Sequence, residues 1–188
     1  MSHVEIKVGG ILGRGGFCTV TELLEVDLKG GGGGRHEKAQ VINRSSSLIS
    51  IQDRAFISKH CDRDGQCRYA IKRLSENLIT KSKSRFVAGV VDLAMEAKYL
   101  SILQHPHIIK LRGMSNSHPC SDTFFVVLDR LYDTLTERMV SWKKTARRMS
   151  GLGSVRDFNG NKKEEQLGMR LIVAYDIGSA LSFLHQNK

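Results

Sequence analysis

The stretch Leu12-Gly13-Arg14-Gly15-Gly16-Phe17-Cys18-Thr19-Val20 determines how the N-terminal part of the chain folds. Residues 4–8 before it alternate apolar and polar, and residues 21–26 after it have the composition of a second strand. Two strands joined by glycines indicate a hairpin, and glycines let backbone N–H groups approach phosphates without a Cβ clash. A dinucleotide-binding fingerprint needs a helix directly after the glycines. Because residues 20–26 lack a helical pattern, that alternative is excluded.

Further along the chain, other segments have the periodicity of regular structure. We expect strands at residues 68–74, 108–113 and 124–128 and helices at residues 86–104, 135–142 and 167–185. Ser84 is the expected N-cap of the helix over residues 86–104, and His105-Pro106 follows its end.

A glutamate in the first of these helices needs a partner. Glu96 lies on the apolar stripe, three residues after Leu93 and four before Leu100. A carboxylate that faces a core is costly unless it is paired, and no cation lies four residues away. Lys72, which shares one face of its strand with Ala70, is the expected partner.

Composition limits the class of protein. The chain has 188 residues, of which 40% are hydrophobic and 26% are charged, the balance of a soluble globular protein. No run of about 18 apolar residues and no N-terminal signal pattern were found, so we expect neither a membrane-spanning helix nor secretion. The four cysteines are too few for a disulfide scaffold. We therefore expect reduced thiols and an intracellular, cytoplasmic location.

The net charge of +10 leaves more than one class of partner open. Basic proteins bind nucleic acids, anionic membranes or phosphate ligands. Two polar insertions are predicted, a flexible one at about residues 29–66 and a second at about residues 143–166. The second is expected to be a loop and holds seven basic and three acidic residues. Nucleic-acid binding through residues 143–148 is one alternative, but no zinc-finger spacing or aromatic RNA-binding signature accompanies the charge. We therefore expect no nucleic acid and no membrane as partners.

Taken in order, these segments resemble the eukaryotic protein kinases. The family pattern is a glycine-rich loop ending in valine, an Ala-x-Lys strand and a glutamate on the following helix. The glycine-rich stretch matches the loop, Tyr69-Ala70-Ile71-Lys72 the strand, and Asp92-Leu93-Ala94-Met95-Glu96 the helix. Residues 105–111, 125–131 and 176–185 are similar to the family's His-Pro-Asn segment, its fifth strand with the hinge, and the helix before the catalytic loop.

The resemblance implies a fold and a domain organisation. The fold would be α+β, with an antiparallel five-stranded N-lobe sheet, one main helix and a partial helical C-lobe. Residues 1–131 would form the N-lobe with the first insertion, and residues 132–188 the hinge exit and partial C-lobe with the second.

The resemblance also implies a function and a site. The family transfers the γ-phosphate of ATP to protein hydroxyls, and general likeness favours serine or threonine as acceptor. Lys72 would contact the α- and β-phosphates and be held by Glu96, while Leu12, Val20 and Ala70 enclose the adenine. Leu128 would be the gatekeeper, and the Asp129 carbonyl and Leu131 amide would bind the adenine edge. The implied ATP-binding residues are Leu12, Gly13, Arg14, Gly15, Gly16, Phe17, Cys18, Thr19, Val20, Ala70, Lys72, Leu128, Asp129 and Leu131.

Two departures from the family pattern matter for activity. Cys18 takes the place of the third glycine, where small residues are tolerated in the family. His-Arg-Asp, its asparagine and Asp-Phe-Gly do not occur in the 188 residues, so the catalytic aspartate and metal ligands of the family are missing. We expect a kinase domain cut before its catalytic loop and inactive alone, with Mg²⁺ bound only by the missing part. The alternative is a non-catalytic, pseudokinase-like nucleotide-binding module.

Overall fold

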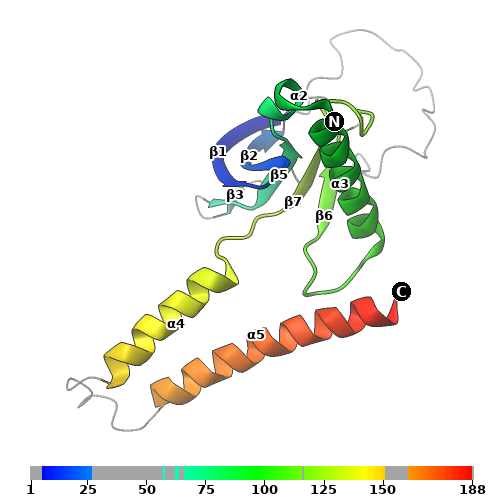
Figure 1. Ribbon diagram of the computed structural model, residues 1–188. Helices are drawn as coiled ribbons and strands as arrows, with labels where there is room; N and C mark the ends of the chain where they lie inside the picture. The colour runs from blue at the N-terminus through cyan, green and yellow to red at the C-terminus, as the bar shows by residue number, and fades with distance from the viewer. Residues whose placement is uncertain are drawn as a thin grey trace, which may run out of the picture. The chain divides into compact units, whose positions relative to one another are not determined.

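The computed structural model describes residues 6–26, 57, 62–63, 66–115, 117–150 and 161–187 (Figure 1). It divides into two compact units. The first comprises residues 1–104 and 109–130, and the second comprises residues 105–108 and 131–188. The division at Arg130 and Leu131 lies next to the boundary proposed from the sequence, and it assigns residues 105–108 to the second unit.

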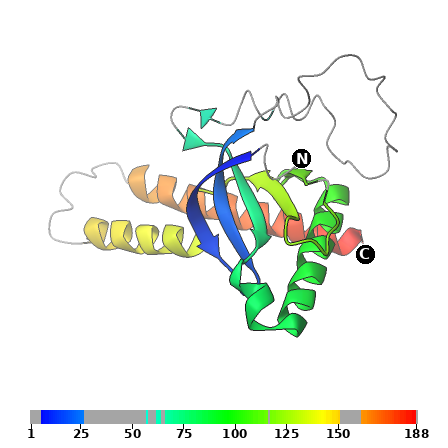
Figure 2. The same cartoon turned by 90° about the horizontal axis from the view of Figure 1, so that it is seen from above.

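Antiparallel strands form a five-stranded sheet in the first unit, in the order β1-β2-β5-β7-β6 (Figure 2). The predicted α+β class with a five-stranded antiparallel sheet is therefore confirmed. Its strands are β1 (Ile6–Arg14), β2 (Cys18–Val26), β5 (Tyr69–Leu74), β6 (Leu111–Met114) and β7 (Phe125–Asp129). Two short strands, β3 (Asp62–Arg63) and β4 (Gln66–Cys67), pair with each other at the C-terminal end of the predicted insertion over residues 29–66.

Both faces of the central strands β2, β5 and β7 are largely buried, because their side chains alternate between two apolar clusters. Leu23, Tyr69, Ile71, Phe125 and Val127 belong to one cluster, which Ile57 joins from the predicted insertion. The other cluster lies under helix α3 and contains Cys18, Leu74, Val126 and Leu128 together with Val90, Leu93 and Ala97. Residues 124–128 contribute to both clusters, which explains their unbroken apolar run. Most of the rest of the first insertion lies outside the described residues.

Helix α3 begins and ends earlier than the sequence predicted. A short helix, α2 (Asn77–Lys81), precedes it, and α3 spans Lys83–Ile102. The N-cap is Ser82 and not Ser84, because the Ser82 hydroxyl accepts the Arg85 N–H at 3.4 Å. Ser84 lies inside the first turn, where its hydroxyl is 2.9 Å from that of Ser82.

Gly89 allows α3 to pack closely on the hairpin and on α2. A Cβ at this position would lie 2.9 Å from Leu78 Cδ2 and 3.0 Å from Phe17 Cβ. Separations below about 3.0 Å force the neighbouring groups to move, so a larger residue would displace the helix. The same contact brings the glycine-rich segment and the helix that carries Glu96 together.

The second unit contains two long helices, α4 (Leu135–Ser150) and α5 (Asn161–Gln186). Residues 143–150 and 161–166 are therefore helical, and the loop expected over residues 143–166 is wrong in these parts. Residues 151–160 lie outside the described residues. The expected helices over residues 135–142 and 167–185 are confirmed as parts of α4 and α5.

A histidine pair belongs to the second unit, although it follows α3 in the sequence. The His107 N–H donates to His105 Nδ1 at 3.2 Å, and His105 Nε2 lies 3.2 Å from the Ser179 hydroxyl. His107 Nε2 lies 3.3 Å from a carboxylate oxygen of Asp176. Because Nδ1 of neutral His105 accepts, its Nε2–H donates to Ser179, so this pair cannot activate the serine as a nucleophile.

Helix α5 exposes apolar side chains along its length. Leu171, Ile172 and Tyr175 are 60%, 61% and 72% exposed. Among the described residues, the segment Lys163–Gln186 is long and apolar enough to cross a membrane by length and composition, a criterion that core helices of soluble proteins also meet. The sequence-based exclusion of any such segment is therefore wrong, while the intracellular location stays a prediction.

Candidate functional site

An ion pair between strand β5 and helix α3 forms the centre of the candidate site. Lys72 Nζ donates to Glu96 Oε2, and the two side chains are 22% and 29% exposed. Glu96 takes its place on α3 between the buried residues Leu93 and Ala97. The pairing expected from the sequence is therefore confirmed, and it meets the need of a half-buried carboxylate for a cation.

The sheet register places the surrounding residues of the site. Val20, Lys72 and Val126 are directly opposite one another on β2, β5 and β7 and form one row. Ala70 is opposite Leu128 in the row two residues away, on the same face of the sheet. Ala70 and Leu128 are buried, at 4% and 6% exposure. Four of the predicted ATP-binding residues, Val20, Ala70, Lys72 and Leu128, thus share one face with the ion pair.

Cys18 lies within the electrostatic field of this pair. Burial raises the pKa of the Cys18 thiol, the positive charge of Lys72 lowers it, and the carboxylates of Glu96 and Asp92 raise it. The net direction is upward, so the thiol is a weaker nucleophile than an ordinary cysteine. Cys18 packs with Val126 and Leu93 in the cluster under α3.

The glycine-rich segment closes the hairpin and leaves space beside it. The Gly15 N–H donates to the Cys18 carbonyl at 2.7 Å, which forms the turn between β1 and β2. A Cβ at Gly13 or Gly16 would meet no atom of the described residues within 4 Å. Packing among those residues therefore does not require glycine at these two positions, whereas a ligand that approaches the backbone would.

Two predicted residues of this segment lie on the opposite face of the sheet. Arg14 is opposite Thr19, and Thr19 is opposite Arg73, so the three form one row across β1, β2 and β5. Because neighbouring residues of a strand point to opposite faces, Thr19 and Arg73 face away from Val20 and Lys72. Arg14 and Thr19 can therefore serve a ligand on the Lys72 face only through their backbone groups.

Leu12 and Phe17, also predicted from the glycine-rich stretch, have different surroundings. Leu12 lies between the pairs Ile11–Thr21 and Gly13–Val20, where the register of β1 shifts, and is 37% exposed. Phe17 packs against the cluster under α3, and the Arg85 guanidinium lies 5.9 Å from its ring centroid. Phe17 thus anchors the turn to the helix.

The predicted hinge residues fall at the junction of the two units. Asp129 ends β7, and its N–H donates to the Lys110 carbonyl at 3.4 Å. Its carboxylate accepts two hydrogen bonds from Arg112, at 2.7 and 3.0 Å, and the hydrogen bond raises the pKa of Arg112. Leu131 is the first residue of the longer segment of the second unit. The Arg112 partner was not foreseen, because the two residues are distant in sequence and meet only when β6 pairs with β7.

Glu22 is another charged residue that the sequence did not reveal. Its carboxylate accepts the Gly10 N–H at 3.1 Å and pairs with Arg130 at 2.9 Å. Glu22 is opposite Ala70 in the register, on the same face as Lys72. The alternation within residues 21–26 predicts the face of the strand on which Glu22 lies. Its partners Gly10 and Arg130 become known only from the folded structure.

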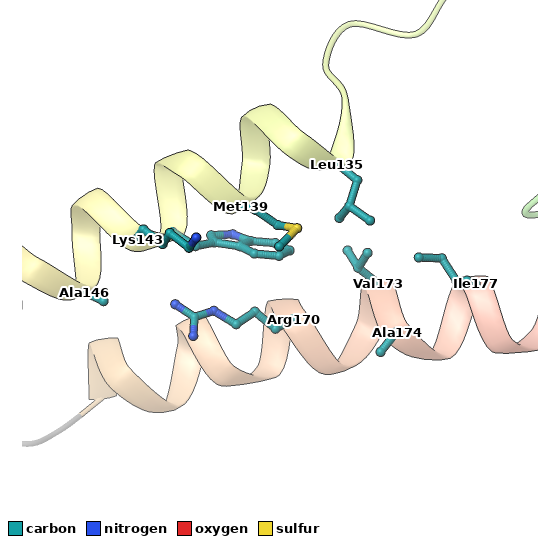
Figure 3. A pocket seen from close by; sticks show the side chains of 9 residues that line it. Leu135, Met139, Lys143, Ala146, Arg170, Val173, Ala174 and Ile177 are labelled. Atoms are coloured by element: carbon teal, nitrogen blue, oxygen red, sulfur yellow. The ribbon is translucent and has the colours of Figure 1, made fainter.

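An apolar groove of about 430 Å³ runs between α4 and α5 in the second unit (Figure 3). Leu135 and Met139 of α4 lie across it from Val173 and Ile177 of α5 (Figure 3). The Arg170 guanidinium is 5.6 Å from the centroid of the Trp142 ring. The basic residues of the nucleic-acid alternative, within residues 143–148, also belong to α4.

No protein-family model matches this chain, and no curated protein matches it closely enough to count as a relative. Among the described residues, no group of three or more His, Cys, Asp or Glu side chains could hold a metal ion. The function can therefore be inferred only from the sequence motifs and the geometry of the site.

Proposed function

We propose that this chain binds ATP and is the ATP-binding portion of a protein serine/threonine kinase. The family's kinase fold is part of this proposal. The observation that carries it is the Lys72–Glu96 ion pair, which joins a sheet and a helix across 24 residues of sequence. A lysine that is fixed in this way presents an oriented cation to a phosphate, as the kinase resemblance requires.

The surroundings of the pair support a nucleotide. Val20, Ala70 and Leu128 give the same face of the sheet an apolar surface suited to a planar base. The open space beside Gly13 and Gly16 would let phosphates approach the backbone of the hairpin. The chain itself would bind and orient the nucleotide. The phosphoryl group to be transferred would be supplied by ATP.

Phosphotransfer needs parts that these 188 residues do not contain. The catalytic aspartate and the Asp-Phe-Gly metal site of the family orient the acceptor hydroxyl and hold Mg²⁺, and neither motif occurs in the sequence. We therefore expect nucleotide binding without turnover from this chain alone. A non-catalytic regulatory module is the second candidate, and the same missing motifs favour it. Phosphotransfer by the purified chain that Lys72→Met abolishes would contradict the expected inactivity.

Thermal unfolding with and without ATP tests the proposal. A ligand that binds only the folded state raises the unfolding temperature, and the rise grows with the ratio of ligand concentration to dissociation constant. We expect ATP to raise the temperature of the unmodified chain and to have little effect on Lys72→Met.

The matched control is Lys98→Met, which removes the same charge from an exposed position on α3. This variant should respond to ATP as the unmodified chain does. An equal response of Lys72→Met and Lys98→Met, or no response of the unmodified chain, would contradict the proposal.

A further inference from the structure

Apart from the groove between α4 and α5, a cavity lies in the first unit. It is formed by β1, β2, β5 and the turn that follows β5. Its volume is about 190 Å³. This is smaller than the roughly 300–1,000 Å³ of pockets for drug-sized ligands, and it suits a small group. The polar residues that line it include Arg14, Thr19, Thr21, Arg73, Ser75 and Asn77.

The register of the sheet separates this cavity from the nucleotide site. Arg14, Thr19 and Arg73 form one row across three strands, and Val20 and Lys72 are the next residues along β2 and β5. Side chains of successive strand residues point to opposite faces. The cavity and the Lys72–Glu96 pair therefore lie on opposite faces of one sheet.

The charges around the cavity favour an anion. Within the part of the chain that the structure describes, Arg14 makes no ion pair or hydrogen bond through its side chain. Arg73 Nη2 lies 3.0 Å from Glu76 Oε1, but the Glu76 side chain is 81% exposed, so its charge is largely screened by water. Glu76 also lines the cavity and is the only carboxylate among the described residues that line it. Two guanidinium groups thus face one solvated acid.

Hydroxyl groups complete the polar lining. The Thr19 and Ser75 hydroxyl oxygens are 2.9 Å apart, and one of them donates to the other. Thr21 is 4% exposed, and its hydroxyl has no hydrogen-bond partner among the described residues. Guanidinium groups bind phosphate through paired N–H donors, and hydroxyls add further hydrogen-bond donors without adding charge.

We propose that this cavity binds a phosphate-type dianion, either free phosphate or the phosphoryl group of a phosphorylated side chain. Arg14 and Arg73 bind its oxygens from the two ends of the row, with Thr19 and Ser75 as hydroxyl donors. This site does not depend on the proposed nucleotide function, because none of these side chains faces Lys72.

Calorimetric titration of the full chain with inorganic phosphate tests the site, with sodium chloride added to hold the ionic strength constant. We expect saturable binding of one phosphate at this site. Arg14→Gln and Arg73→Gln should each weaken it about tenfold or more, because hydrogen bonds to charged groups are the strong ones. Arg14→Lys should lose part of the affinity, since it keeps the charge without the paired donors.

Two control variants separate this site from general charge effects and from the nucleotide site. Lys7→Gln removes one exposed charge from the same strand outside the cavity. Lys72→Met removes the lysine of the opposite face. Both should bind phosphate at this site as the unmodified chain does. Titration with a phosphoserine peptide and its unphosphorylated form distinguishes the two sources of the anion, because tighter binding of the phosphopeptide than of free phosphate indicates a protein-borne group.

Unchanged binding in Arg14→Gln would overturn the proposal, as would loss of all phosphate binding in Lys72→Met. Arg14 is exposed at the end of β1, so its replacement does not threaten folding. If Arg73→Gln fails to fold, the Arg14 variants alone decide the outcome. Absence of saturable phosphate and phosphopeptide binding by the unmodified chain would also refute the site.

Discussion

At the scale of single residues, Lys72 and Glu96 illustrate what the sequence could predict. Glu96 was recognisable because a carboxylate on an apolar helical stripe needs a partner, and the structure supplies Lys72. The sequence did not predict that the Arg14 and Thr19 side chains face away from Lys72. The register of the hairpin shifts within β1, and no local sequence pattern determines such a shift. The partners of Glu22 and Asp129 were missed for a related reason, since they lie on other segments of the chain.

Cys18 should react slowly with iodoacetamide. Its thiol is buried and its pKa is raised by burial, whereas Cys120 is exposed. Only the thiolate form of cysteine is nucleophilic. Because its pKa is raised, Cys18 has a smaller fraction in the thiolate form than an ordinary cysteine at the same pH. We expect peptide mapping at pH 8 to show alkylation of Cys120 well before Cys18. Replacing Lys72 by methionine should slow Cys18 further, because the lysine charge lowers the thiol pKa. Equal rates at the two cysteines in the unmodified chain would contradict this account.

At the scale of elements, strands were easier to predict than the ends of helices. Alternation and apolar runs identified the hairpin, β5 and β7, because each face of the sheet has its own apolar cluster. In α4, the basic residues after Trp142 made the helical pattern hard to recognise, although the apolar residue Ala146 continues it. The charge density was therefore interpreted as a loop, although a charged outer face is compatible with a helix.

The N-terminus of α4 has a capping box whose effect depends on pH. Glu137 Oε2 accepts the Thr134 N–H at 2.7 Å, and the Glu137 N–H donates to the Thr134 hydroxyl at 3.2 Å. The hydrogen bonds that the Glu137 carboxylate accepts from the Thr134 N–H and, at 2.9 Å, from the Thr134 hydroxyl lower the pKa of Glu137. A lowered pKa means that the stabilisation is present above the ordinary glutamate pKa and is lost as the pH falls through the folded-state value.

Thr134→Ala should therefore destabilise the first turn of α4 by about 1 kcal/mol. Amide hydrogen exchange in α4 measures this as faster exchange in the variant. The Glu137→Gln variant should show a smaller pH dependence of that exchange after correction for the intrinsic rate. Thr136→Ala is the control, because Thr136 lies between the two residues of the box and has no part in their hydrogen bonds. Equal effects of Thr134→Ala and Thr136→Ala would argue against the cap.

At the scale of the whole molecule, the two units differ in how they bury apolar surface. The sheet of the first unit is covered by core residues on both faces, whereas α5 exposes many apolar side chains. The sequence did not reveal that residues 105–108 belong to the second unit, because that assignment depends on contacts such as His107 with Asp176.

We expect the exposed face of α5 to cause self-association of the purified chain. Exposed apolar patches of this kind drive association or bind apolar dyes. Light scattering and dye fluorescence should both decrease when Leu171 and Tyr175, 60% and 72% exposed, are replaced by lysine. Replacing two exposed polar residues of the same helix, Glu164 and Glu165, by glutamine is the control. A monodisperse monomer with one cooperative unfolding transition would contradict the expectation.

A double-mutant cycle on ATP affinity tests most directly whether Lys72 and Glu96 bind the nucleotide together. If Glu96 acts by holding Lys72 against the phosphates, the two residues work as a unit and their effects do not add. We predict that Lys72→Met raises the ATP dissociation constant about tenfold or more. Glu96→Gln should raise it less, and the double variant should bind ATP no more weakly than Lys72→Met alone. Additive losses, or an unchanged dissociation constant in Lys72→Met, would contradict the account.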